Sequence, residues 1–276
     1  MARSMKAGGR EAEGAGARVY VVPTPLELAR AAAGRLWGIA RERAGAGPVH
    51  FALSGGETPR RAYETLSAEP YRTRFPWEAV HFWQVDERFV PPSDPRSNRR
   101  MIGEVLLSRA PVPPERFHGF DTALPDTAAA AAAYEAELRK MFPGASGSAP
   151  RFDAIVLGIG LDGHTASLFP GSPSLSPEQK ALAVPAEGGD PPVPRVSMSL
   201  PLINAAARVI FLAQGEAKAE ALREAVAASR DASPRSAAFP AGLVAPKRGT
   251  VVFLADASAG GLLPPAWRTA QAPGEK

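Results

Sequence analysis

Short apolar runs alternate with segments of helical periodicity along the chain, and this alternation limits the possible folds more than any other feature. The first apolar run, at 19–22, precedes a segment at 25–44 whose apolar residues recur every three or four positions. Strands that are separated by helices pair in parallel and bury both faces. The sequence therefore predicts an α/β fold with a mostly parallel, Rossmann-like sheet and helices on both of its faces. Further apolar runs lie at 49–53, 79–85, 153–157, 209–213 and 250–254, and further helical segments lie from 59, at 98–107, at 127–141 and from 215.

Polar residues follow four of the apolar runs directly. The clusters are Ser54–Thr58, Asp86–Arg88, Asp162–His164 and Gly215–Lys218. In a parallel sheet the carboxyl ends of neighbouring strands meet at one edge, and open α/β sheets bind their ligands there. We therefore expect one pocket to collect all four clusters.

The segment Gly158–Gly171 places an acid and a histidine in a glycine-rich turn after an apolar run. Glycines let a backbone bend sharply and approach a ligand closely. His164 is then the candidate general base, because an imidazole accepts a proton near neutral pH, and Asp162 would orient the ring or the substrate. Asp86 is a second candidate partner for His164, and the sequence does not rank the two carboxylates. A structural histidine that caps a turn is the alternative.

Gly158, Gly160 and Gly163 also match the G-x-G-x-x-G pattern of dinucleotide-binding sites. Such a site needs a helix of ordinary length after the third glycine, and a second strand that ends in an acid about 20 residues later. Pro170 and Pro173 interrupt any helix within two turns. A nicotinamide cofactor is therefore not expected, and no other cofactor is predicted.

Ser54, Gly55 and Gly56 lie where a strand passes into a helix, with Thr58 as the expected N-cap and Pro59 at the first helical position. Backbone N–H groups, a hydroxyl and the positive end of a helix dipole together suit a phosphate or a carboxylate. The spacing is not that of a Walker A loop, so nucleoside triphosphates are not indicated. A tight turn with a capped helix is an equally weighted alternative.

Three cations could add to this anion site. Lys218 would supply a point charge, and Arg88 and Arg195 would supply forked donors. Each of the three, taken alone, is more typical of a solvated surface charge.

The sequence contains no cysteine, which excludes disulfides, thiolate nucleophiles and thiolate metal ligands. A zinc site needs clustered ligands, and four histidines scattered along the chain do not predict one. His50, His81 and His118 lack a glycine-rich context and are interpreted as structural. Ser167 lacks the G-x-S-x-G elbow that serine hydrolases carry.

The chain has 276 residues, 45% of them hydrophobic, which is enough for one large buried core. Its 32 Lys and Arg and 28 Asp and Glu are mixed along the sequence, so the net charge of +4 favours an acidic small molecule over nucleic acid. No apolar run approaches the roughly 20 residues that cross a bilayer. We expect a cytoplasmic monomer or weak homo-oligomer that binds neither nucleic acid nor membranes. One domain is expected at 18–265, between a flexible leader at 1–17 and a flexible tail at 266–276.

Five motifs follow one another over most of residues 50–225. Their patterns are SGGxTP, DERxV with a later SN pair, GxGxDGHTASLFPG, R-[VI]-[ST] ending in P-x-x-N, and G-x-x-K-A. In this chain they stand at Ser54–Pro59, Asp86–Val90 with Ser97–Asn98, Gly158–Gly171, Arg195–Asn204 and Gly215–Ala219. In this order and spacing they resemble the 6-phosphogluconolactonase family, and the set is much more specific than any single motif.

The resemblance implies hydrolysis of 6-phospho-D-glucono-1,5-lactone to 6-phosphogluconate in the oxidative pentose phosphate pathway. A δ-lactone is an activated ester, so one positioned base and an oriented substrate would suffice without a metal. By position, His164 would activate water, and Arg88 beside Asp86 would contact the substrate. The residues that would hold the 6-phosphate are Ser54, Gly55, Gly56, Thr58, Arg195 and Lys218.

One departure and two alternatives bear on this resemblance. The family often carries a histidine shortly before the SN pair, and this chain has none at 91–96. Related sugar-phosphate deaminases and isomerases resemble DGHIAFNEPG in the histidine turn, with a carboxylate where this chain has Phe169. A sugar-phosphate sensor fused to a DNA-binding domain is disfavoured by the short segment before Val19. The segment 171–194 is either an ordered lid or a loose loop.

Overall fold

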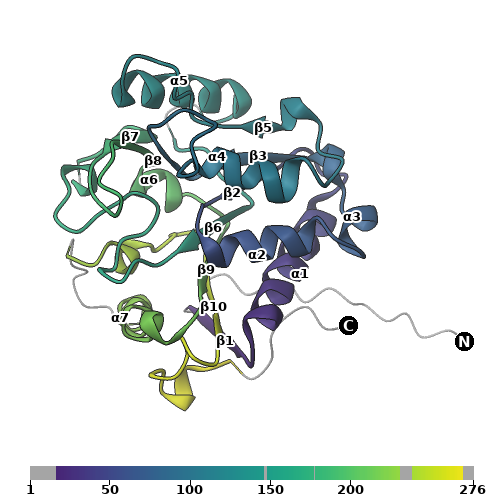
Figure 1. Ribbon diagram of the computed structural model, residues 1–276, viewed down its shortest axis with the longest axis vertical. Helices are drawn as coiled ribbons and strands as arrows, with labels where there is room; N and C mark the ends of the chain where they lie inside the picture. The colour runs from purple at the N-terminus through teal and green to yellow at the C-terminus, as the bar shows by residue number, and fades with distance from the viewer. Residues whose placement is uncertain (1–16, 146–147, 177, 231–237, 270–276) are drawn as a thin grey trace, which may run out of the picture.

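Seven parallel strands form the central sheet. Their order across the sheet is β1-β10-β9-β6-β2-β3-β5 (Figure 1). The predicted α/β fold with a parallel sheet is confirmed, and every predicted apolar run forms a strand. The computed structural model describes residues 17–145, 148–176, 178–230 and 238–269. Within them the strands are β1 (Arg18–Val22), β2 (Val49–Leu53), β3 (Val80–Gln84), β5 (Phe117–His118), β6 (Ala154–Gly158), β9 (Arg208–Ala213) and β10 (Thr250–Asp256).

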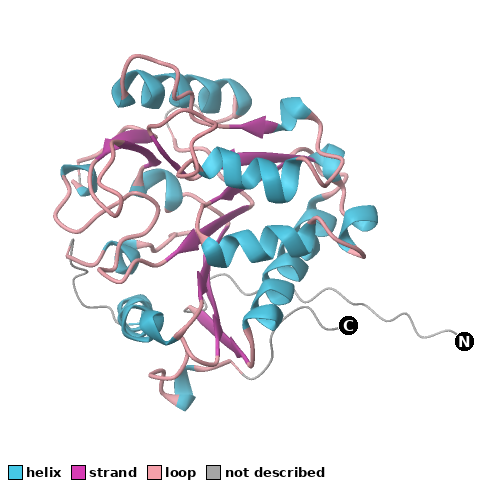
Figure 2. Cartoon of the chain, viewed as in Figure 1, coloured by secondary structure: helices cyan, strands magenta, loops and turns pink. Residues whose placement is uncertain are grey.

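Helices cover both faces of this sheet (Figure 2). Alternate residues of β9 point to the two layers: Val209 and Phe211 belong to one buried cluster, and Ile210 and Leu212 belong to the other. Because both faces are buried, the strands are apolar throughout. On one face lie α1 (Pro25–Arg43), α2 (Glu57–Leu66) and α4 (Asn98–Ile102), and on the other lie α5 (Thr127–Met141), α6 (Leu200–Ile203) and α7 (Ala219–Arg230).

The chain reverses its direction across the sheet between β2 and β6, which are neighbours. From β2 it continues to β3 on one side, and from β6 it continues to β9 on the other. Such a switch point opens a crevice beyond the carboxyl ends of the two strands, where α/β proteins bind ligands. The four polar clusters follow β9, β6, β2 and β3, which are four consecutive strands of the sheet. The four clusters therefore lie along one edge of the sheet.

A second, antiparallel sheet stands beside this edge and was not predicted. Its strands are β4 (Asp86–Arg88), β8 (Arg195–Met198) and β7 (Ala183–Ala186), in the order β4-β8-β7. The Asp86–Arg88 cluster is thus a strand of its own, with Arg88 opposite Arg195 in register. Most of the segment 171–194 is described, and it contains β7 and a 3-10 turn at Pro173–Leu175, so the segment is not a loose loop.

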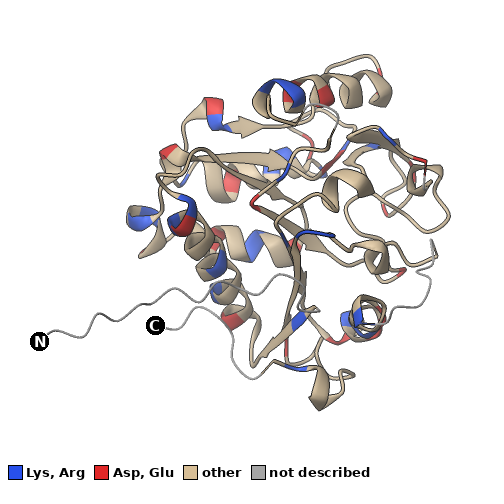
Figure 3. Ribbon diagram, turned by 180° about the vertical axis from the view of Figure 1, so that it is seen from behind, with Lys and Arg blue, Asp and Glu red and all other residues tan. Residues whose placement is uncertain are grey.

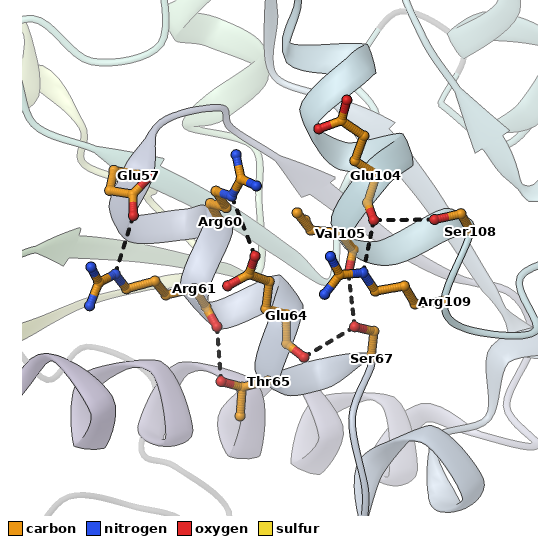
Figure 4. A network of polar contacts seen from close by, with 10 residues as sticks. All are labelled: Glu57, Arg60, Arg61, Glu64, Thr65, Ser67, Glu104, Val105, Ser108 and Arg109. Atoms are coloured by element: carbon orange, nitrogen blue, oxygen red, sulfur yellow. Dashed lines mark hydrogen bonds and ion pairs between the residues drawn. The ribbon is translucent and has the colours of Figure 1, made fainter.

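The start of α2 differs from the prediction. The helix begins at Glu57, and Gly56, with a φ of 104°, stands at the N-cap, so the prediction of Thr58 as N-cap was wrong. Pro59 then falls within the first turn of the helix. Backbone N–H groups in this turn make no intrahelical hydrogen bond, so the proline breaks none. At its other end α2 is tied to the neighbouring helix, because Ser67 Oγ donates to the carbonyl oxygen of Val105 (2.8 Å) (Figure 4).

The predicted helix at 98–107 is confirmed, but it has two parts. The α-helical α4 ends at Ile102, and a π-helical turn continues it over Gly103–Leu107. A further short helix, α3 (Tyr71–Arg74), follows α2.

The described ends of the chain meet at the sheet edge. Thr269 N donates to the carbonyl oxygen of Val19 (2.6 Å), and Val19 N donates to Thr269 Oγ1 (3.2 Å). The first residues of the predicted tail therefore pair with β1, while 1–16 and 270–276 lie outside the described residues. Acidic and basic residues are interspersed over the ribbon (Figure 3). Among the described helices none is long and apolar enough to cross a membrane.

Three of the four histidines gather on β2, β3 and β5, away from the polar clusters. His50 and His81 are the second residues of β2 and β3, and His118 is the last residue of β5. The rings of His50 and His81 stack with centroids 4.9 Å apart, and His81 Nδ1 lies 2.8 Å from His118 Nε2. His118 Nδ1 in turn lies 2.5 Å from Glu137 Oε1 on α5, and Arg116 contacts His81 Nε2. The histidines are buried, and they are clustered in space although they are scattered in sequence.

This cluster should make stability depend on pH. Burial, aided by nearby positive charge, lowers the pKa of His50 to about 3 and that of His81 to about 4. Both rings stay neutral in the folded chain while the unfolded chain binds protons below pH about 6.5. The free energy of unfolding should therefore fall as the pH drops from about 6.5 toward about 4.

Urea unfolding of wild type and His50→Gln at pH 7.5, 6, 5 and 4.5 tests this expectation. A glutamine can still accept the hydrogen bond that Trp83 Nε1 donates to His50 Nδ1 (3.1 Å), but it does not titrate. The variant should lose less stability than wild type on acidification. Equal losses in the two proteins would show that His50 does not contribute.

Candidate active site

The Ser-Gly-Gly loop is fixed by the hydrogen bonds of its first residue. Ser54 is buried, its Oγ donates to the carbonyl oxygen of Val156 (2.8 Å), and its own carbonyl oxygen accepts from the Tyr63 hydroxyl (3.0 Å). This hydrogen bond from the Ser54 hydroxyl links the end of β2 to β6 at the switch point. Gly56 and Glu57 follow at the start of α2, where the N–H groups have no intrahelical acceptor. These backbone donors remain suited to an anion.

Asn98 packs directly against this loop. A Cβ atom on Gly55 would lie 1.9 Å from Asn98 Oδ1, so the close approach requires glycine. Asn98 Nδ2 donates to the carbonyl oxygen of Asp86 (3.0 Å). The buried asparagine thus joins the Ser-Gly-Gly loop to β4.

His164 and Asp162 form a pair that is open to solvent. Asp162 Oδ1 lies 2.6 Å from His164 Nδ1 and 3.1 Å from His164 N, and the side chains of His164 and Asp162 are 32% and 50% exposed. Burial raises the pKa of Asp162, but the hydrogen bonds from His164 outweigh it, so the pKa lies below its ordinary value. An ionised carboxylate only accepts hydrogen bonds. In the neutral ring of His164 the proton therefore lies on Nδ1, and Nε2 keeps a lone pair.

The carboxylate of Asp86 is directed to other partners. Its Oδ2 accepts from Ser167 Oγ (2.6 Å), and its Oδ1 lies 3.5 Å from Asn98 Nδ2. The structure therefore places Asp162, and not Asp86, beside the imidazole, which ranks the two carboxylates that the sequence could not. Ser167 is preceded by Ala166, whose φ of 52° is uncommon for a residue other than glycine. This local strain belongs to the turn that aims Ser167 at Asp86.

Phe169 lies between His164 and Arg195. Its ring centroid is 4.7 Å from that of His164, and the guanidinium carbon of Arg195 lies 5.4 Å from it. Arg195 is buried, and its Nε and Nη2 donate to backbone carbonyl oxygens within 188–191 (3.0 and 3.2 Å). Burial lowers the pKa of Arg195, and the positive charge of Arg88 adds to this effect. Two nitrogen atoms of the Arg195 guanidinium, which was predicted to bind the phosphate, are therefore already hydrogen-bonded to the backbone.

Lys218 follows β9, the strand next to β6 in the sheet. It ends a 3-10 turn, Glu216–Lys218, that follows β9, and it is half-buried. Burial lowers the pKa of Lys218, and the negative charge of Asp162 opposes this shift. The ammonium group thus lies within electrostatic range of the His164–Asp162 pair.

A cavity of about 320 Å³ borders the Ser-Gly-Gly loop at the amino end of α2. Arg60, Arg88 and Arg100 line it, together with Asn98 and acidic side chains. Arg88 Nη1 donates to the carbonyl oxygen of Arg96 (2.7 Å), whereas its buried Nε has no hydrogen-bond partner in the described structure. Three guanidinium groups at a helix amino terminus suit an anionic ligand. In the part of the chain that is described, no three His, Asp or Glu side chains are grouped to hold a metal ion.

Comparison with known proteins identifies the family of the chain. Residues 23–253 match the family model described as glucosamine-6-phosphate isomerases/6-phosphogluconolactonase. The chain belongs to this family. A 6-phosphogluconolactonase of Synechocystis sp. is 40% identical over 215 residues, which cover 78% of this chain and 85% of that protein. A 6-phosphogluconolactonase of Nostoc sp. is 37% identical over 214 residues, which cover 78% and 84%.

Solved structures extend the likeness to the fold of this glucosamine-6-phosphate isomerase/6-phosphogluconolactonase family. A 6-phosphogluconolactonase from Trypanosoma brucei matches 90% of this chain and 99% of its own, with a TM-score of 0.76 and 29% identity. The predicted likeness to 6-phosphogluconolactonases is therefore confirmed, and with it the prediction that the chain is an enzyme of this group.

The structure brings the predicted residues of this family member to one edge, and it adds others that the sequence analysis missed. Three such residues, Glu87, Asn98 and Ser167, each lie within one of the family motifs. Their place in a motif was the only sign in the sequence that they could belong to the site. Their roles depend on partners from other elements, which no local pattern reveals. The residues predicted for the site lie in the loops and turns after β2, β6 and β9 or in the second sheet, and of them Gly56 and Arg88 line the cavity. They are Ser54, Gly55, Gly56, Thr58, Asp86, Arg88, Asp162, His164, Arg195 and Lys218.

Proposed function

We propose that this chain hydrolyses 6-phospho-D-glucono-1,5-lactone to 6-phosphogluconate, with His164 as the general base. The observation that carries the proposal is the solvent-open His164–Asp162 pair at the switch point of the sheet. An imidazole whose Nδ1 proton is held by a carboxylate presents Nε2 as an acceptor for the proton of a water molecule.

The hydrolysis then needs no further acid or base. As the water oxygen bonds to the lactone carbonyl carbon, His164 Nε2 takes a proton from the water. The tetrahedral intermediate collapses, the carbonyl re-forms, and the bond from this carbon to the ring oxygen breaks. The imidazolium returns its proton to the departing ring oxygen, which becomes a hydroxyl group. Asp162 stabilises the imidazolium while it exists, because the hydrogen bond between them is then charged on both sides.

The phosphate of the substrate is assigned to the anion-binding part of the site. The start of α2 offers backbone donors, Lys218 offers a cation within electrostatic range of Asp162, and Arg88 lines the adjoining cavity. Arg195 supports this side through its charge and through Phe169, since two of its own donors are used by the backbone.

The environment of His164 favours hydrolysis over sugar-phosphate isomerisation or deamination. Those reactions move protons between sugar carbons and open the ring, so they need additional acid or base groups. The histidine turn of the related deaminases and isomerases has a carboxylate residue where this chain has Phe169. The centroid of the Phe169 ring lies 4.7 Å from that of His164.

A direct assay tests the proposal and the phosphate site together. Freshly prepared 6-phosphogluconolactone is followed by NMR against its spontaneous hydrolysis, and wild type should accelerate its loss. Lys218→Ala should raise KM for this lactone about tenfold or more, because a charge-assisted hydrogen bond is lost, and it should change the hydrolysis of unphosphorylated glucono-1,5-lactone much less.

Lys140→Ala serves as the matched control, because Lys140 is an exposed cation in the last turn of α5. It should leave both lactones unaffected. Wild type that only matches the spontaneous rate would refute the proposed activity. Activity with an unchanged KM in the Lys218 variant would keep the activity but remove Lys218 from the phosphate site.

A further inference from the structure

Glu87 is a buried carboxylate between two residues of the site, and the proposed chemistry does not use it. Its side chain is 1% exposed. It accepts five hydrogen bonds, all from neutral donors. Its Oε1 accepts from Arg88 N (2.7 Å) and Asn98 N (2.8 Å). Its Oε2 accepts from Gln84 Nε2 (2.9 Å), Ser97 Oγ (3.0 Å) and Arg99 N (2.7 Å).

These bonds clamp both ends of the loop that runs from β4 to α4. One end is the N–H of Arg88, and the other is the stretch 97–99. Between them the Arg88 guanidinium donates back to the carbonyl oxygen of Arg96 (2.7 Å). The direction of the Arg88 side chain therefore depends on the path of a loop whose two ends meet at one carboxylate.

The same clamp sets the position of Asn98. Its N–H is held by Glu87, and its side chain bonds the carbonyl oxygen of Asp86 and packs against Gly55. The contact between the Ser-Gly-Gly loop and β4 is thus maintained through Glu87. From these contacts we infer that Glu87 is a positioning residue, which holds Arg88 and Asn98 in place around the phosphate of the substrate. This inference rests on the proposed function.

A glutamine of the same shape could not replace the carboxylate. Ionised glutamate offers two acceptor oxygens, whereas glutamine has one oxygen and an NH₂ group that would face N–H donors. Burial raises the pKa of Glu87, and the N–H groups of Arg99 and Asn98 and the amide of Gln84 work against that rise. The net pKa of Glu87 stays above its ordinary value, so the ionised form follows from the geometry: backbone N–H groups, which only donate, bind both carboxylate oxygens.

Asp153 offers a matched control for Glu87→Gln. It is also a buried carboxylate, and it accepts from His50 N (2.9 Å) and from Arg43 Nε (2.8 Å) at the opposite end of the sheet. Both Glu87→Gln and Asp153→Asn should lower the melting temperature, since each leaves buried donors unpaired. Only Glu87→Gln should alter how the enzyme treats the phosphate.

The experiment measures kcat and KM for 6-phosphogluconolactone and for glucono-1,5-lactone in wild type, Glu87→Gln, Arg88→Ala and the double variant. Glu87→Gln should raise KM for the phosphorylated lactone at least about tenfold, because a displaced contact group weakens binding, and it should affect the unphosphorylated lactone much less. In the Arg88→Ala background the same change should raise KM by a smaller factor, because only its effect through Asn98 remains.

Three outcomes would overturn the inference. In one, Glu87→Gln loses stability like Asp153→Asn and keeps its KM. In another, its effect on KM is undiminished in the Arg88→Ala background. In the third, wild type shows no lactonase activity, which would also refute the proposed function, whereas the first two leave that function intact. If Glu87→Gln does not fold, Ser97→Ala removes one of the five donors, and it should raise KM by a smaller factor with the fold retained.

Discussion

Replacing His164 by alanine is expected to slow enzymatic lactone hydrolysis by roughly 10²- to 10⁴-fold, the usual contribution of a general base. The loss should fall on kcat, because the imidazole acts on water and not on the phosphate. The side chain is partly exposed, so its removal should leave the melting temperature nearly unchanged. NMR of fresh 6-phosphogluconolactone, corrected for spontaneous hydrolysis, measures the effect.

A folded His164→Ala protein that keeps most of its activity would move the base to another group. His118→Ala provides the comparison, because His118 lies in the buried cluster at the far end of the strands. It should lower stability and leave kcat close to that of wild type.

Gly160→Ala is expected to reduce kcat about 10²-fold by displacing the catalytic pair, without unfolding the protein. A Cβ atom at this position would lie 2.0 Å from His164 Nδ1 and 2.5 Å from Asp162 Oδ1. Neither atom can stay where it is, and the 2.6 Å hydrogen bond between them must lengthen or break. The backbone of Gly160 is outside the left-handed region, so alanine itself is tolerated there.

Gly158→Ala is the control for this prediction, because a Cβ atom on Gly158 meets nothing within 4 Å. It lies two residues earlier, at the end of β6, and its substitution should leave kcat within a few-fold of wild type. Steady-state kinetics of the two variants, with thermal melts, compare the effects directly. Equal activity in both would mean that the His164–Asp162 geometry is not needed for the reaction.

The parallel sheet could be predicted from the sequence because its strands are buried on both faces. Val209 to Ala213, for example, contribute alternately to the two apolar clusters, which makes a continuous apolar run. The second sheet could not be predicted in this way. β4 and β8 are polar at Asp86, Glu87, Arg88 and Arg195, and their burial depends on partners that are distant in sequence.

The residue types of the site were visible in the motifs, but their pairing was not. A glycine-rich turn with His164 predicts a base, yet the choice of Asp162 over Asp86 depends on Ser167 and Asn98, which occupy the second carboxylate. The predicted N-cap at Thr58 failed for a related reason. The positive φ of Gly56 starts the helix earlier than the usual capping residues indicate.

The register of the second sheet also has a consequence for how this molecule becomes active. Arg88 and Arg195 stand opposite one another on β4 and β8, although they are far apart along the chain. Such non-local pairing forms only after a long loop has been closed, at an entropic cost that contacts between neighbouring elements do not carry. A nascent chain that has not yet emerged as far as β8 can already pair β2 with β3 and β6, but it lacks one wall of the site. Catalytic activity should therefore be among the last properties that a newly made molecule acquires, and a partly folded molecule should be inactive.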